Sequence, residues 1–147
     1  MKPTVTWIVI ADGARARILS NTGPGKGLTP VEGAIFQGEH LPAREIMADK
    51  PGRTFESVGS ARHAKEASSD PHELLKVEFL DTLASELIER DSEFDRLILV
   101  APPHALGTLR KALNKPLENK VHAELRKDLT HIPNGELPRH LDAVIAL

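Results

Sequence analysis

The apolar run Leu97–Ala101 (LILVA) is the feature that most constrains the fold of this chain. A continuous run of aliphatic residues that ends at Pro102-Pro103 is typical of a strand covered on both faces. Such strands belong mostly to parallel sheets, in which neighbouring strands are joined by helical crossovers. The run therefore predicts an α/β domain with this strand inside its sheet.

The N-terminal segment predicts a three-stranded antiparallel meander. Its first apolar run is β-branched and aromatic, and the second alternates apolar with basic residues, as a half-exposed strand does. Gly-containing turns separate the runs, and Gly33 interrupts the third. We expect strands at Val5–Ile10, Ala14–Ser20 and Val31–Gln37, with turns at Asp12-Gly13 and Asn21–Gly27.

The remainder predicts helices that alternate with strands. A helix is expected to begin at Ser69-Asp70-Pro71, with Ser69 or Asp70 as its N-cap, and to run to Arg90. Beyond the LILVA strand we expect a helix carrying Leu106, Leu109 and Leu113, a strand at Val121–Arg126, and a last helix that starts near Glu136 and carries Leu137, Leu141, Val144 and Ile145. The order βββ-loop-α-β-α-β-α predicts one domain over residues 1–147, with a five-stranded mixed sheet in a ribonuclease H-like arrangement.

One long polar segment, Asp49–Pro71, interrupts this pattern. It has almost no apolar periodicity, and loops of this length inside a compact domain are usually functional or disordered. Its part Lys50–Lys65 carries four basic residues and one acidic residue. The segment is therefore the first candidate for a contact with a partner.

Composition excludes several classes of function. Cysteine is absent, which excludes disulfides, thiolate catalysis and cysteine-ligated zinc and suits a reducing compartment. No apolar run approaches the roughly 20 residues of a membrane span, so we expect a cytoplasmic protein without membrane insertion. One Trp, four Phe and no Tyr are too few for a base-stacking platform. We expect no cofactor.

Four segments carry a resemblance to a known family. They are TWIVIADGARARIL (Thr6–Leu19), GSARH (Gly59–His63), LILVAPPHALGTLRKAL (Leu97–Leu113) and AELRKDLTHIPNGEL (Ala123–Leu137). In this order and spacing the chain resembles a bacterial family named for attachment to host cells. That family is in turn similar to the middle domain of archaeal and eukaryotic class-1 peptide release factors.

The resemblance implies a ribonuclease H-like fold and a partner such as the ribosome or transfer RNA. In release factors, the loop between the meander and the first helix carries Gly-Gly-Gln. Here Gly59 matches one glycine, but no glutamine follows, so termination activity is not implied. We therefore expect a non-enzymatic domain that contacts RNA through this loop. The expected contact residues are Lys50, Arg53, Gly59, Ser60, Arg62, His63 and Lys65.

Other groups of residues have the chemical types for metal binding or catalysis, but simpler interpretations fit them better. His63, Asp70 and His72 are metal-ligating types without a specific spacing, and Asp70 is better explained as an N-cap. Ser60, His63 and Asp70 have the residue types of a hydrolytic triad but lack a nucleophile elbow. Asp12, Glu73 and Asp95 match a two-metal nuclease poorly. We predict no metal site.

A second candidate crevice lies where strands end. Ligands of α/β sheets favour the carboxyl ends of strands, and such positions hold Asp12, His104, Thr130 and His131. The simpler interpretation, which we prefer, is that Asp128 and Thr130 bond local backbone. Arg15 and Arg17 share one face of the second strand, where they are either solvent-facing or phosphate-contacting.

Two further functions stay open at this stage. One is a protein-interaction module for host attachment, with an acidic helix face (Glu73, Glu86, Glu89, Glu93) or a sheet edge as its contact. The other is a small hydrolase that uses Ser60 and His63 of the loop.

Overall fold

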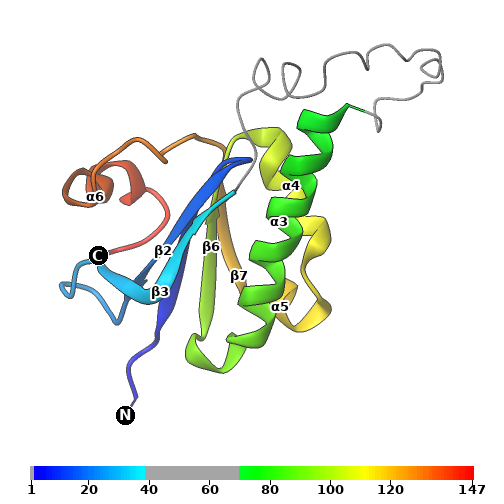
Figure 1. Cartoon of the computed structure of the whole chain (residues 1–147). Coiled ribbons are helices and arrows are strands. Elements are labelled where there is room, and N and C mark those ends of the chain that lie inside the picture. Colours follow the sequence, from blue (N-terminus) through cyan, green and yellow to red (C-terminus); the bar gives the residue numbers. More distant parts are fainter. Residues whose placement is uncertain (1, 39–69) are drawn as a thin grey trace, which may run out of the picture.

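A computed structural model describes residues 2–38 and 70–147 (Figure 1). Within these residues, five strands form one mixed sheet in the order β3-β2-β1-β6-β7. The first three strands pair antiparallel, and β1 pairs parallel with β6, as β6 does with β7. The five-stranded mixed α/β sheet predicted from the sequence is confirmed.

The two central strands are buried on both faces. Every residue of β1 (Thr6–Ala11) is buried, and four of the five residues of β6 (Arg96–Val100) are buried. Alternate residues enter two separate cores: Val9 packs toward α3, whereas Ile8 packs toward the C-terminal segment. Continuous apolar runs arise here because a strand between two covered faces has no solvent side.

The meander follows the predicted order with shifted bounds. β2 spans Arg15–Asn21 and β3 spans Thr29–Gln37. β3 begins two residues earlier than expected because Thr29 and Pro30 still pair with β2. Gly33 has a φ of 73°, and the register of the β2–β3 pair shifts between Arg17 and Leu19. This irregularity bends the edge strand without ending it.

Helix α3 (Pro71–Glu89) begins as predicted. The Asp70 carboxylate accepts a hydrogen bond from the His72 N–H at 3.0 Å, which caps the first turn. The helix buries one side against the sheet through Phe79, Leu80, Leu83, Ala84 and Leu87. After the short 3₁₀ helix η1 (Asp91–Glu93) the chain enters β6.

The segment after β6 holds one element that the sequence analysis missed. α4 (Pro103–Ala112) is followed by the short helix α5 (Lys115–Lys120) and by β7 (Val121–Leu125). The Asn114 side chain caps α5 by accepting from the Leu117 N–H at 3.1 Å. Six residues are too few for a recognisable apolar period, although the cap and a first-turn proline were readable.

The C-terminal segment covers the opposite face of the sheet from α3, α4 and α5 (Figure 1). The 3₁₀ helix η2 (Asn134–Glu136) leads into α6 (Leu137–Leu141). The prediction that this helix continues through Ile145 was wrong: it ends at Leu141, and turns follow. Ile145 is still buried, because it packs onto the sheet from the turn. Among residues 2–38 and 70–147, no helix has both the length and the apolar character of a membrane-crossing segment.

Candidate functional site

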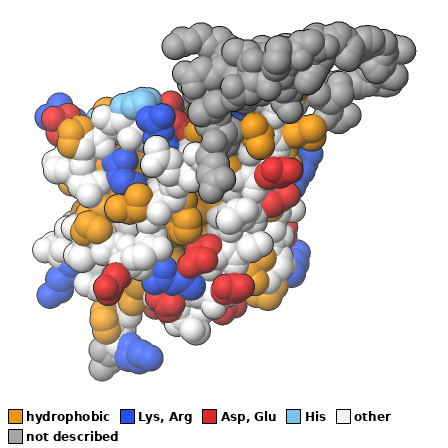
Figure 2. All heavy atoms as spheres, in the orientation of Figure 1, with side chains coloured by type: hydrophobic (Ala, Val, Ile, Leu, Met, Phe, Trp, Pro, Cys, Tyr) orange, Lys and Arg blue, Asp and Glu red, His pale blue; other side chains and the backbone are white. Residues whose placement is uncertain are grey.

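The carboxyl ends of the parallel strands meet at one edge of the sheet, here called the carboxyl edge. Asp12-Gly13 follows β1, Pro102-Pro103 follows β6, and Arg126–Asp128 follows β7. The described residues that flank positions 39–69 also lie here: the Gly38 N–H donates to the Ala14 carbonyl, and Asp70 caps α3. On the face drawn in Figure 2, histidine and charged side chains of both signs gather along this upper border.

Asp12 organises the turn between β1 and β2. Its Oδ1 accepts hydrogen bonds from the N–H groups of Ala14 and Arg15, each at 2.8 Å. Its Oδ2 lies 3.2 Å from the Thr130 hydroxyl, on the segment that follows β7. One carboxylate thus joins the meander to the C-terminal segment.

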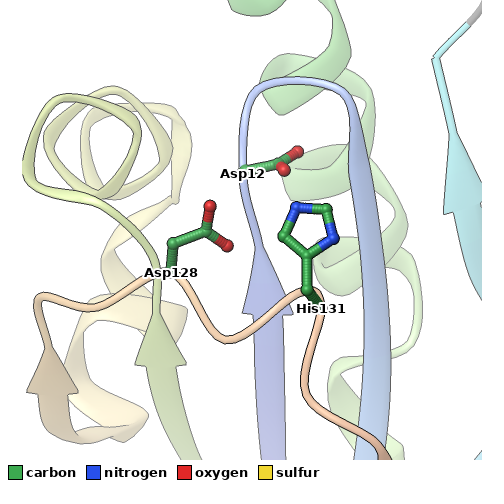
Figure 3. A group of neighbouring side chains, drawn as sticks. All are labelled: Asp12, Asp128 and His131. Carbon is green, nitrogen blue, oxygen red and sulfur yellow. The ribbon is translucent and has the colours of Figure 1, made fainter.

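Asp12, Asp128 and His131 come together beside this junction, and Figure 3 shows their side chains gathered between the strand ends. One ligand-type atom from each residue lies within 4.8 Å of the other two. Two carboxylates and an imidazole are of the donor types that bind divalent cations. However, Asp128 and His131 are exposed, and Arg15 Nη1 lies 3.4 Å from His131 Nδ1. A guanidinium therefore already supplies positive charge here.

Thr130 donates two hydrogen bonds to the carboxylate of Asp128. The Asp128 Oδ1 accepts from the Thr130 N–H at 3.0 Å and from its hydroxyl at 2.6 Å. Partial burial opposes ionisation, but these two hydrogen bonds, with His131 and Arg15 nearby, outweigh it and hold the pKa of Asp128 below its ordinary value. The surroundings of Asp128 therefore favour its ionised, hydrogen-bond-accepting form.

Arg17 holds the segment after β7 against the sheet. Its guanidinium donates to the carbonyls of Thr130 (3.0 Å) and Ile132 and to the Asn134 side chain (2.8 Å). Burial lowers the pKa of Arg17 below that of a free arginine. Arg17 is thus partly buried, and all three guanidinium nitrogens bond to the segment after β7. Arg15, two residues earlier, remains exposed.

A pocket of about 290 Å³ opens on the other side of Asp12. It lies between the β1–β2 turn and the N-terminal halves of α3 and α4. His104 Nε2 and Glu73 Oε2 lie 2.7 Å apart on its wall. The pocket is lined by Asp12, Gly13, Ala14, His72, Glu73, Lys76, Val77, Leu80, Pro102, His104, Ala105 and Thr108.

Gly13 leaves room for Lys76 at the rim of this pocket. A Cβ at this position would lie 2.8 Å from Cγ and 2.9 Å from Cδ of Lys76. The aliphatic part of the lysine therefore lies directly over the turn, while its side chain borders the pocket. The Asp-Gly pair serves both the hairpin and this close approach.

The predicted crevice residues divide between two places. Asp12, Thr130 and His131 lie together, whereas His104 lies in the pocket with Glu73, and Asp12 borders both. The residues expected to act in the loop, Lys50, Arg53, Gly59, Ser60, Arg62, His63 and Lys65, lie outside the described residues. Of the nuclease candidates, Asp95 binds the Val5 N–H at the opposite end of the sheet.

The sequence analysis did not place Lys76 or Thr108 in a site, and it considered Glu73 only as a nuclease residue and as part of an acidic helix face. The spacing of residues along a helix shows which of them share a face, but it does not show which other element that face packs against. Asp128 was read only as a turn residue, although it follows β7 much as Asp12 follows β1.

Comparison with known proteins gives one family match. The family model described as "Protein required for attachment to host cells" matches residues 7–141. No curated protein has a matching sequence.

Among solved structures, the chain is similar to a crystal structure of archaeal translation termination factor aRF1. The TM-score is 0.50 and the sequence identity is 14%, and the match covers 82% of this chain. It covers 29% of the termination factor, so the chain corresponds to about one third of that protein. At this identity the likeness shows a shared fold.

Proposed function

The chain belongs to the family described as "Protein required for attachment to host cells", and we propose that it serves there as a non-enzymatic RNA-binding domain. Its partner is transfer RNA or the RNA of a ribosome, and its contact surface is the carboxyl edge together with the polar segment Asp49–Pro71. The name of the termination factor with the same fold supports a partner from translation.

One observation carries this proposal. The described residues on both sides of the polar segment attach to the carboxyl edge, at Gly38 through the Ala14 carbonyl and at Asp70 through the α3 cap. The described fold thus breaks off at Gly38 and resumes at Asp70, both at the edge that sheets of this class use for ligands. The chain between these two residues includes Lys50–Lys65, with four basic residues and one acidic residue. Phosphate contacts by Lys and Arg dominate the affinity of most RNA-binding surfaces.

The test is an RNA-binding titration at several salt concentrations. Wild-type protein is expected to bind a fluorescent transfer RNA with an affinity that falls steeply as salt rises, because bound cations are released. Lys50, Arg53, Arg62 and Lys65 replaced together by Glu should lower affinity at least about 10-fold and flatten the salt slope.

A matched variant controls for net charge. Lys2, Lys26, Lys111 and Lys115 are exposed lysines of the described residues that do not line the pocket or the Asp12 cluster. Their replacement by Glu gives the same net charge and should lower affinity much less. Equal losses in both variants, or no salt-sensitive binding by the wild type in this assay and in ribosome pelleting, would contradict the proposal.

A protein partner is the second candidate, and one observation favours a sheet edge over the acidic helix face. Ile35 on the edge strand β3 is 81% exposed. On the acidic helix face, by contrast, Glu86 and Glu93 are paired with Arg90, and Glu73 contacts the imidazole of His104. If a pull-down recovers one protein despite nuclease treatment, and Ile35→Lys abolishes the recovery, this candidate replaces the first.

A further inference from the structure

The pocket between α3 and α4 has an apolar interior. Leu80 and Ala105 are buried at its walls, and Val77 and Pro102 add apolar surface. Its volume of about 290 Å³ lies at the lower limit for small-molecule sites, which are roughly 300–1,000 Å³. An interior of this size and character suits one flat ring system.

The rim of the pocket offers hydrogen-bond acceptors. Glu73 Oε2 is bound to His104, while Oε1 has no hydrogen bond from the residues the structure describes. Asp12 is a second carboxylate on the rim. Ionised carboxylates only accept hydrogen bonds, so a ring that bonds to them must present N–H donors.

Positive charge and an exposed ring complete the rim. The Lys76 side chain borders the pocket and supplies an ammonium group for a phosphate. The imidazole of His104 is 77% exposed, so a ring entering the pocket can stack on it. Unstacked RNA bases are typically held in this way, by stacking and by hydrogen bonds to their edges.

We propose that the pocket lined by Glu73, Lys76 and His104 binds a single unstacked guanine base with its phosphate. Guanine suits it because its N1–H and N2–H₂ donors are adjacent and match carboxylate acceptors. This inference rests on the proposed function for the source of the base, which is the bound RNA. The same chemistry is present in free guanosine monophosphate.

The test separates the pocket from the RNA surface. Wild-type protein is titrated with the four nucleoside 5′-monophosphates, and binding is followed by NMR shifts of backbone amides. We expect the guanine nucleotide to bind at least about 10-fold more tightly than the other three, with the largest shifts at Glu73, Lys76 and His104. Equal binding of all four, no binding, or shifts elsewhere would overturn the proposal.

Two variants locate the site. Thr108→Phe fills the pocket from α4 and should abolish guanine nucleotide binding, whereas Thr82→Phe makes the same change on the exposed surface of α3 and should leave it unchanged. Glu73→Gln replaces one acceptor oxygen by a donor and should reduce the preference for guanine about 10-fold. If Thr108→Phe still binds the nucleotide, the site lies elsewhere.

The two proposals fail in different ways. Transfer RNA binding without nucleotide binding would overturn the pocket and leave the RNA surface standing. Nucleotide binding without transfer RNA or ribosome binding would support the pocket for a free nucleotide and overturn the proposed function. When both occur, Thr108→Phe should weaken RNA binding modestly while the salt slope stays the same.

Discussion

The two ends of the sheet use polar residues in different ways. At the amino ends of β1 and β6, polar groups are satisfied by the fold itself. The Val5 N–H donates to the Asp95 carboxylate at 2.8 Å, and Arg96 Nε donates to the Thr6 hydroxyl at 3.0 Å. Lys120 donates to the carbonyls of Asp91 and Phe94. These hydrogen bonds join neighbouring elements of the fold at that end of the sheet.

At the carboxyl edge, polar groups of similar type share a hydrogen-bond donor or border a pocket. Asp12 and Asp128 surround a single Thr130 hydroxyl, which has one proton to donate. Glu73 and His104 face a pocket rather than a packed neighbour. The difference separates polar residues that join elements of the fold from polar residues that border a pocket, and the second group are the candidates for binding.

The largest expected change in stability comes from Arg17→Met. It removes three hydrogen bonds and leaves the carbonyls of Thr130 and Ile132 without this donor, so the free energy of unfolding should fall by roughly 2–3 kcal/mol. Urea denaturation measures it. Arg15→Met, on the exposed neighbour, should cost far less. Equal effects of the two variants would show that the clamp is not what holds the segment after β7.

Lys120→Met tests the amino end. The variant loses two hydrogen bonds to carbonyls and the contact of its ammonium with the Phe94 ring at 4.8 Å, so we expect a loss of about 2 kcal/mol. Lys115→Met changes an 80% exposed lysine and should be nearly neutral. RNA binding should stay unchanged in both variants. If Lys120→Met lowers RNA affinity, the division between the two ends is wrong.

Asp12→Ala should have a smaller effect on stability. The turn loses a carboxylate that accepts from two N–H groups, which is worth about 1 kcal/mol in thermal or urea denaturation. Asp12→Asn keeps an oxygen acceptor and should retain most of that stability. A loss as large in the Asn variant as in the Ala variant would mean that charge, not the turn hydrogen bonds, matters here.

The smallest expected effect is a pH dependence from Asp128. Its folded pKa lies below the unfolded value, so its contribution to stability is present above the unfolded pKa of about 3.9 and is lost as pH falls through the folded pKa. Wild type should therefore exceed Asp128→Asn in stability at pH 6, and the difference should shrink below about pH 4. A difference that is constant with pH would exclude this linkage.

The strands could be predicted because the pattern of apolar residues along each of them indicates which faces are buried. The LILVA run predicted a strand buried on both faces, and the Ser69-Asp70-Pro71 sequence predicted the start of α3. The end of α6 and the presence of α5 could not be read in the same way. Both are short, and the apolar residues around them are buried by turns as well as by helices.

The candidate site was only partly predictable for a related reason. Asp12 and Thr130 were placed at strand ends by topology alone, but their contact depends on Arg17 drawing the segment after β7 across β2. The pocket depends on how α3 packs beside α4, which places Lys76 over Gly13. Helix spacing does not encode that tertiary contact.

The most direct test of the account is an NMR titration of the isotope-labelled protein with transfer RNA at low salt. Among the described residues, we expect shifted and broadened amide signals to cluster at the carboxyl edge, around Asp12, Lys76, His104 and Thr130. Those around Asp95 and Lys120 should stay in place. Changes centred on the amino end, or spread evenly over the sheet, would contradict the claim that the carboxyl edge is the binding surface.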